Sequence, residues 1–156
     1  VTPVQLVRAI SAVVNGGYLM QPYVVKQILD SDGNVVSNTE PTVIRQVISE
    51  ETSAQVAALA EKVVSETGGS GIRAAVPGYR IGGKTGTSQK LDQDGDDIIL
   101  SFYGYAPADD PEIAIAVYVE KGAQGGTLGT IARDILTAYF SEAGSTDTVP
   151  AENTLN

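Results

Sequence analysis

Three closely spaced runs between residues 80 and 119 constrain the fold more than any other feature of this chain. They cover Arg80–Ser88, Ile98–Ala106 and Ile113–Val119. The second and third are rich in β-branched and aromatic residues, and all three have the length of strands. Only the turn Pro107–Pro111 separates the last two, so they should pair antiparallel. The third run is apolar without alternation, which indicates that both faces of this strand are covered.

A helix is predicted at the very start of the chain. Thr2 can serve as N-cap, Pro3 suits the first helical position, and Gln5 can complete a capping box. Because the chain enters this helix at once and begins with Val1 rather than Met, we expect it to be part of a longer protein. The helix carries an apolar stripe, and it stops at Asn15-Gly16-Gly17. The stripe consists of Leu6, Val7, Ile10, Val13 and Val14.

Two more amphipathic helices and a hairpin are predicted. Ser49 caps the second helix, which Gly68 ends, and the third helix covers Thr127–Phe140. The expected buried faces are Val56, Leu59, Val63 and Val64 in the second helix, and Leu128, Ile131, Ile135 and Tyr139 in the third. Between the first two helices, strands are expected at Tyr23–Leu29 and Val35–Val36, joined by the turn Asp30–Asn34.

These elements predict an α+β fold in which an antiparallel sheet is sandwiched by helices. We expect the third helix on one face of the sheet and the two earlier helices on the other. A chain of 156 residues with 42% apolar residues can build one such core. The domain should cover residues 1–141. Residues 142–156 should form a disordered tail, because the segment from Gly144 is rich in small polar residues.

Composition excludes several classes of function. Ten Lys and Arg residues against nineteen Asp and Glu residues give a net charge of −9, whereas binding to nucleic acid or anionic membranes needs a basic patch. The sequence has no cysteine, and therefore no disulfide or thiolate chemistry. It has no histidine either, which excludes a Ser-His-Asp triad and removes the commonest zinc ligand. We expect no metal and no cofactor.

The candidate site is the run Lys84-Thr85-Gly86-Thr87. The overlapping segment 78–85 also matches the phosphate-loop pattern G-x-x-x-x-G-K-[ST]. A phosphate loop needs a buried strand before it and a helix after it, whereas here Pro77 precedes the pattern and the acidic run Asp92–Asp97 follows. A plainer alternative is that Gly82 and Gly83 let a strand pass close to another backbone.

Two other features could suggest a site, and we interpret both as structural. The turn Asp30–Asn34 is not followed by a suitably placed acidic residue, so it is not expected to bind calcium. The run Asp92–Asp97 is not expected to bind calcium either, because an EF-hand would need Gly at the position of Asp97 and Glu at the position of Tyr103. Asp92–Asp97 is interpreted as a solvated loop. Ser88 has no histidine and no Ser-x-x-Lys motif to activate it, so it is not expected to be a nucleophile.

The order of these motifs closely resembles the C-terminal part of a penicillin-binding protein transpeptidase domain, of the class B, cell-division or elongation type. The resemblance covers residues 1 to 141. Lys-Thr-Gly is one of three signatures of the penicillin-interacting serine enzymes. The other two, Ser-x-x-Lys and Ser-x-Asn, do not occur in this chain. The motifs that carry the resemblance are the helix start Val1–Leu6, Asn15-Gly16-Gly17, Gly82–Gln89 and Ser101–Pro107.

The resemblance implies roles for four residues. Lys84 and Thr87 would be catalytic, the lysine as a cation near the serine of the absent Ser-x-Asn and the threonine through a backbone N–H in the oxyanion hole. Thr85, Gly86 and Thr87 would bind the substrate. The two threonines would contact the carboxylate of D-Ala-D-Ala or of a β-lactam, and Gly86 would leave room for the substrate backbone.

The implied function is a serine-type D,D-transpeptidase that binds penicillin and crosslinks peptidoglycan through an acyl-serine. This chain would be the substrate-binding half and inactive alone. Its partners would be the peptidoglycan stem peptide, β-lactams and the rest of the domain. The protein would lie on the extracytoplasmic face of a bacterial plasma membrane, anchored through another segment. A non-catalytic binding or scaffold module is the alternative, and a carboxypeptidase or β-lactamase would share the chemistry but differ in the acceptor.

Overall fold

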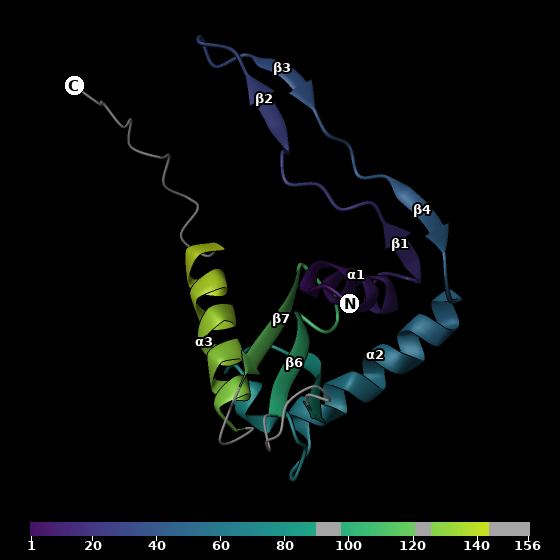
Figure 1. Ribbon diagram of the computed structural model, residues 1–156, viewed down its shortest axis with the longest axis vertical. Coiled ribbons are helices and arrows are strands. Elements are labelled where there is room, and N and C mark those ends of the chain that lie inside the picture. Colours follow the sequence, from purple (N-terminus) through teal and green to yellow (C-terminus); the bar gives the residue numbers. More distant parts are fainter. Residues whose placement is uncertain (90–97, 121–125, 144–156) are drawn as a thin grey trace, which may run out of the picture.

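A three-stranded antiparallel sheet forms the centre of the fold (Figure 1). The computed structural model describes residues 1–89, 98–120 and 126–143, and the structural statements below refer to these residues. In spatial order, the strands are β5 (Gly82–Gln89), β6 (Ile98–Ala106) and β7 (Ile113–Glu120). The predicted antiparallel pairing is confirmed. The bounds of β6 match the prediction, whereas β5 begins two residues later than expected.

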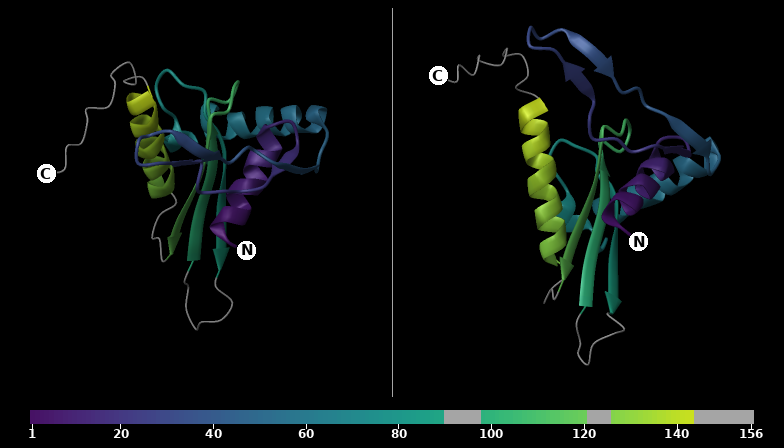
Figure 2. Two further views of the ribbon diagram at one scale, coloured as in Figure 1. Left: turned by 90° about the horizontal axis from the view of Figure 1, so that it is seen from above. Right: turned by 45° about the horizontal axis from the view of Figure 1, so that its top comes forward.

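Helices cover both faces of the sheet, as predicted (Figure 2). The helix α3 (Gly126–Ala143) and the short 3₁₀ helix η1 (Ile72–Ala74) lie on one face. The helices α1 (Pro3–Val14) and α2 (Glu50–Ser65) lie on the other. The prediction of an α+β fold is therefore confirmed.

Side chains at the helix starts confirm the predicted caps. The Thr2 hydroxyl accepts a hydrogen bond from the Gln5 amide, and the Gln5 side chain accepts one from the Thr2 amide, which completes the capping box. Ser49 caps α2 by accepting from the Thr52 amide at 3.1 Å. The two helices are joined through Ser53, whose hydroxyl donates to the backbone carbonyl of Val13.

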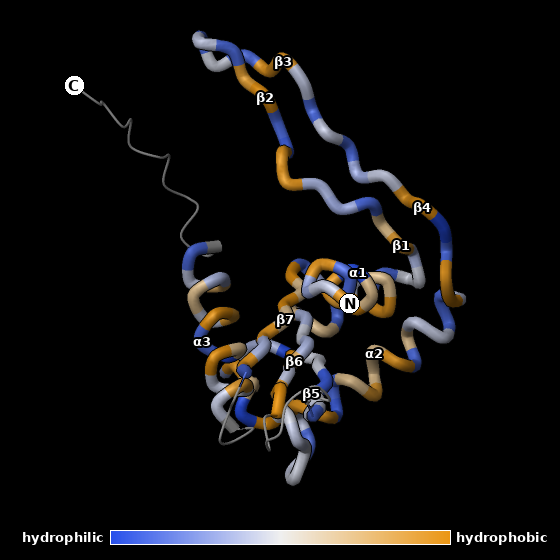
Figure 3. The backbone as a smooth tube through the Cα atoms, viewed as in Figure 1, coloured by the Kyte–Doolittle hydropathy of each residue, from blue (hydrophilic) through white to orange (hydrophobic). Residues whose placement is uncertain are grey.

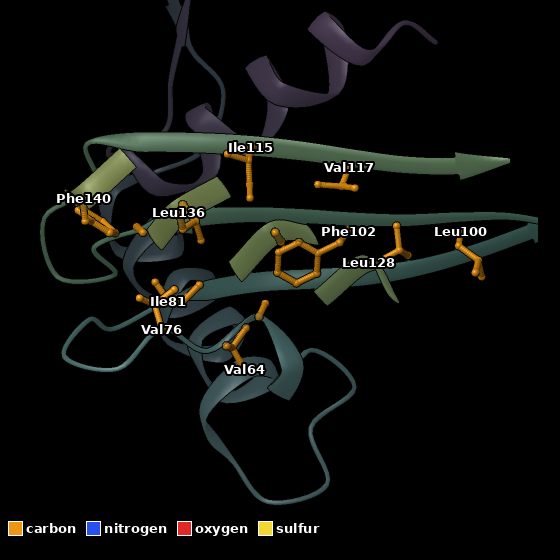
Figure 4. Close-up of a cluster of buried hydrophobic side chains, with 13 residues drawn as sticks. Val64, Val76, Ile81, Leu100, Phe102, Ile115, Val117, Leu128, Leu136 and Phe140 are labelled. Carbon is orange, nitrogen blue, oxygen red and sulfur yellow. The ribbon is translucent and has the colours of Figure 1, made fainter. Parts of the chain in front are cut away.

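The hydrophobic core lies between the sheet and α3 (Figure 4). Phe102 of β6 is fully buried at its centre. The side chains of α3 that pack on Phe102 recur every four residues. This spacing places them in one row along the helix, and such rows pack against neighbouring elements. The prediction of Ile135 on this face is wrong, because its side chain is 44% exposed. The buried row is Leu128, Ala132, Leu136 and Phe140.

The predicted buried face of α2 is also wrong in part. Val64 is buried, but Val56 and Leu59 are 39% and 63% exposed. Both line an apolar cavity of about 310 Å³ between α1, α2 and the sheet. The apolar pattern on α2 is therefore real, but part of it faces this cavity instead of a filled core.

Residues 18–46, which we call the arm, extend away from the sheet (Figure 1). The arm contains two antiparallel pairs, β1 (Tyr18–Met20) with β4 (Val43–Gln46), and β2 (Gln27–Leu29) with β3 (Val35–Asn38). The predicted hairpin is confirmed, but its first strand is shorter than expected and the pair β1–β4 was missed. The turn is held by the Asp30 carboxylate, which accepts from the amides of Asp32 and Asn34.

The last helix is longer than the predicted Thr127–Phe140. The helix α3 continues to Ala143 and so includes two residues that were assigned to the tail. Residues 144–156 and the acidic run 92–97 lie outside the described residues, and the predictions for them stay predictions.

Candidate functional site

Strand β5 carries the candidate site, and two glycines at its start let it lie against large rings of β6. A Cβ atom on Gly82 would come within 2.2 Å of the Tyr105 ring, and one on Gly83 within 2.5 Å of the Phe102 ring. These rings lie on opposite faces of the sheet, so each glycine makes room on one face. The expectation that Gly82 and Gly83 permit a close approach is thus supported, although side chains of β6 make the closest contacts.

Lys84 lies at the mouth of the apolar cavity. It is exposed, stands opposite Tyr103 in the register of β5 and β6, and lines the cavity together with that tyrosine. Its ammonium group donates a hydrogen bond to the backbone carbonyl of Thr85. The Tyr118 hydroxyl donates to that of Tyr103 at 2.7 Å, and the pKa of Tyr118 is raised to about 12, chiefly by burial and then by this hydrogen bond.

Thr85, Gly86 and Thr87 follow on the same strand. Thr85 is half-buried, and its hydroxyl lies 2.8 Å from that of Ser70. Thr87 is exposed, opposite Leu100. A Cβ atom on Gly86 would lie 2.5 Å from the Ser101 hydroxyl oxygen, so any side chain here would require Ser101 of β6 to move. The four predicted site residues therefore follow one another on β5, and Lys84 and Thr85 point to opposite faces of the sheet.

The geometry of β5 contradicts the phosphate-loop alternative. Residues 84–89 continue as a strand, whereas a phosphate loop must open a helix directly after the lysine. Ser88 is exposed at the end of β5, and among the described residues no side chain that could act as a general base is hydrogen-bonded to its hydroxyl. Over the same residues, no group of three or more acidic side chains is placed to hold a metal ion.

Side chains outside the motif connect α2 to the segment just before β5 and to β6, and sequence reasoning missed them. Arg80 forms a bidentate ion pair with Glu61, with both N–O distances at 2.7 Å. The hydrogen bond and charge of Arg80 lower the pKa of the Glu61 carboxyl. The Tyr105 hydroxyl donates to the Ala57 carbonyl at 2.8 Å. These contacts join positions 19 and 48 residues apart, so no local sequence pattern could reveal them.

The second edge of β5 is open in the part of the chain that the structure describes. The sheet order is β5-β6-β7, so β5 has a single strand partner there. An extended peptide can add to such an edge through main-chain hydrogen bonds. Strand β5 therefore carries a cation, two threonine hydroxyls and an open edge, which are the kinds of group that bind a peptide ending in a carboxylate.

Comparison with known proteins agrees with this geometry. The model of the penicillin-binding protein transpeptidase domain matches residues 1–137. Stage V sporulation protein D of Bacillus subtilis is 47% identical over 87% of this chain and 23% of its own length. Peptidoglycan D,D-transpeptidase PbpA of Mycolicibacterium smegmatis is 32% identical over 90% of this chain and 30% of its own length.

Solved structures give the same result. The D,D-transpeptidase domain of a peptidoglycan glycosyltransferase from Eggerthella lenta has a TM-score of 0.81 and 31% identity, over 92% of this chain and 33% of that one. Penicillin-binding protein A of M. tuberculosis, as an imipenem acyl-enzyme complex, has a TM-score of 0.76 and 27% identity, over 90% and 31% of the two chains. The chain thus spans about a quarter to a third of these relatives, and it belongs to the penicillin-binding protein transpeptidase domain family.

Proposed function

We propose that this chain forms the substrate-binding wall of a D,D-transpeptidase active site in a class B penicillin-binding protein. The observation that carries the proposal is the edge strand β5, which presents Lys84 at the mouth of an apolar cavity and carries Thr85 and Thr87 directly after it along the strand. The names of the relatives support it, since they include peptidoglycan D,D-transpeptidases and a β-lactam acyl-enzyme.

The proposed roles follow from charge and position. The Lys84 ammonium provides the cation, and the hydroxyls of Thr85 and Thr87 bind the terminal carboxylate of the donor peptide or of a β-lactam. The backbone N–H of Thr87 stabilises the negative charge that develops on the acyl oxygen when a serine attacks. The nucleophilic serine and its lysine lie on another segment of the parent protein, because this chain contains no Ser-x-x-Lys motif.

Location is part of the same proposal. Enzymes that crosslink peptidoglycan act where their substrate lies, which places the parent on the extracytoplasmic face of a bacterial plasma membrane. None of the helices in the described residues is long and apolar enough to cross a membrane. In the proposal, an anchor on another segment of the parent holds it at the membrane.

A labelled penicillin tests the proposal on the full-length parent protein. We expect a covalent adduct on a serine outside these 156 residues, located by mass spectrometry of peptides. Lys84→Ala should slow acylation by about a hundredfold, because a cleft cation and its hydrogen bonds are lost together. Lys62→Ala, at an exposed lysine of α2, is the matched control and should acylate at the wild-type rate.

Two results would contradict the assignment. One is an adduct on Ser88 or another serine of this chain, and the other is a Lys84→Ala parent that acylates normally. If the wild-type parent forms no adduct at all, the chain is part of a non-catalytic binding module of the same fold.

Thr87→Ala separates binding from catalysis at the same site. The oxyanion donor is a backbone N–H, which survives this substitution. The lost hydroxyl should weaken the initial non-covalent complex with penicillin by about three- to tenfold and leave the acylation rate constant nearly unchanged. Stopped-flow measurements over a range of penicillin concentrations separate the two constants. A loss confined to the acylation rate constant would refute the role in carboxylate binding.

A further inference from the structure

Ser70 contacts the candidate site from outside the motif. It lies in the glycine-rich loop of residues 68–71, between α2 and η1. Its hydroxyl oxygen is 2.8 Å from that of Thr85, fifteen residues further along the chain. This is the hydrogen bond that joins the loop to one of the threonines proposed to bind the substrate.

The loop holds Ser70 in a fixed place. The Gly71 amide donates to the Val63 carbonyl at 3.0 Å, and the Gly69 amide donates to the Glu66 carbonyl at 2.9 Å. A Cβ atom on Gly69 would come within 2.3 Å of the Val63 carbonyl oxygen. Gly71 is itself buried, and a Cβ atom on it would lie 3.3 Å from the ring of Phe102. Ser70, although exposed, is therefore tied on both sides to the end of α2 and to the core.

The direction of the hydrogen bond decides what Ser70 can do. A hydroxyl has one donor hydrogen and two acceptor lone pairs. When the Thr85 hydroxyl donates to a carboxylate, its oxygen can still accept, and Ser70 is placed to donate to it. A hydroxyl that accepts one hydrogen bond is a better donor in the next, because the two bonds polarise each other.

We propose that Ser70 is a positioning residue for substrate carboxylate recognition, acting through Thr85. The Ser70 hydroxyl donates to Thr85, fixes the Thr85 rotamer and directs its hydrogen towards the carboxylate. This inference rests on the proposed function, since it assumes that Thr85 binds a carboxylate. It adds a residue that lies outside the Lys-Thr-Gly motif and reaches the ligand only through another side chain.

Substitutions in the full-length parent test this with benzylpenicillin. Ser70→Ala should raise the dissociation constant of the initial complex about three- to tenfold, while the acylation rate constant changes less than about twofold. Ser70→Thr keeps the hydroxyl and should restore binding. Ser65→Ala, at an exposed serine where α2 ends, is the matched control and should leave both constants unchanged.

Two comparisons distinguish a positioning role from a general structural role. Thr85→Val removes the intermediate hydroxyl at nearly constant shape, so Ser70→Ala should cost nothing further in that background. Benzylpenicillin methyl ester lacks the negative charge, so the Ser70→Ala penalty should largely disappear with it. A penalty that persists in the Thr85→Val background or with the ester overturns the inference, and so does a Ser70→Ala parent with wild-type binding. If the proposed function itself is wrong, the wild-type parent forms no penicillin adduct at all.

Discussion

At the scale of single residues, each glycine of β5 is required by a particular neighbour. The family resemblance implies that Gly86 is a glycine because a side chain there would occupy the space of the substrate backbone. The structure adds a requirement from within the sheet, because the Ser101 hydroxyl occupies the position of a Gly86 side chain. Ser101 is itself buried, so it has little room to move away. A glycine in a binding motif can thus be demanded by packing and by substrate at the same time.

The packing requirement at Gly86 can be tested by a double substitution. Gly86→Ala should destabilise the parent domain by about 1 to 3 kcal/mol, the usual cost of overpacking. Ser101→Ala removes the oxygen that would clash, so the double variant should regain much of this loss. Chemical denaturation of all four proteins measures the coupling free energy. Simple addition of the two single effects would show that the clash is relieved elsewhere.

Tyr105 should make the stability of the domain depend on pH in the alkaline range. Burial, with a smaller effect from the Glu61 charge, raises the pKa of Tyr105 from about 10 to about 12. The folded state thus favours the neutral phenol. This contribution is fully present below pH 10 and is lost as the pH rises towards 12, and a shift of this size corresponds to about 2 to 3 kcal/mol.

Tyr105→Phe should isolate this contribution. The variant should be less stable than the wild type at pH 8, because the hydrogen bond to the Ala57 carbonyl is lost. The difference in unfolding free energy should narrow between pH 10 and 12, as measured by denaturation at several pH values. Tyr23→Phe, at a 44% exposed tyrosine of the arm, is the matched control for removing a phenol. A difference that is constant over this range would contradict the predicted role of burial.

At the scale of elements, the strands with strong local signals were predicted well. The bounds of β6 and the cap of α1 follow from β-branched runs and from a capping box, which act over a few residues. The face of α3 was misjudged at Ile135, because periodicity shows that a helix is amphipathic but not which of two adjacent rows contacts the sheet. The pair β1–β4 was missed, since its partners are far apart in sequence and carry no turn signal between them.

In the candidate site, too, sequence predicts what depends on neighbouring residues and misses what depends on long-range contacts. Lys84, Thr85, Gly86 and Thr87 are adjacent in the chain, so a local motif is enough to identify them. Ser70 contacts Thr85 of this strand, Glu61 pairs with Arg80 just before it, and Tyr105 of the neighbouring strand bonds to α2, and only the tertiary fold makes these contacts. Sequence therefore revealed the residues proposed to touch the substrate and missed the contacts that surround them.

The ion pair between Arg80 and Glu61 joins α2 to the segment just before β5 and should be sensitive to acid. Glu61→Gln should lower the melting temperature of the parent domain at pH 7 by about one to three degrees, a small effect because the pair is partly exposed. The Glu61 pKa is lowered in the folded state, so the contribution is present above about pH 4.5 and is lost as the pH falls through the folded pKa. The difference between the two proteins should therefore shrink in acid.

A matched control distinguishes this pair from surface ion pairs in general. Glu66→Gln removes the partner of Lys62, in a pair whose side chains are both about 60% exposed. It should change the melting temperature less than Glu61→Gln does. An equal effect of the two substitutions would show that the link between α2 and the segment just before β5 contributes nothing specific.

At the scale of the whole molecule, a large apolar surface remains uncovered in this chain. Hydrophobic residues recur along the arm (Figure 3), and several of them are exposed, including Val24 at 99% and Val36 at 65%. The cavity beside Lys84 is lined almost entirely by apolar groups. Soluble monomers rarely leave such surfaces open. The relatives are about three to four times longer, which is consistent with further chain packing against these surfaces in the parent.

The isolated chain should therefore aggregate, or stay folded only together with its complementary segment. Strand β7 adds to this tendency, because within the described residues it lies at the edge of the sheet and pairs only with β6. An apolar strand edge offers unpaired backbone groups to other molecules. Light scattering and analytical ultracentrifugation of residues 1–143, with and without the complementary segment, measure the effect. Val36→Lys should reduce aggregation by charging the arm, and Thr39→Lys on the same arm controls for the added charge alone. A soluble monomer with a cooperative thermal transition would show that the open cavity, the arm and the edge of β7 do not need the rest of the domain.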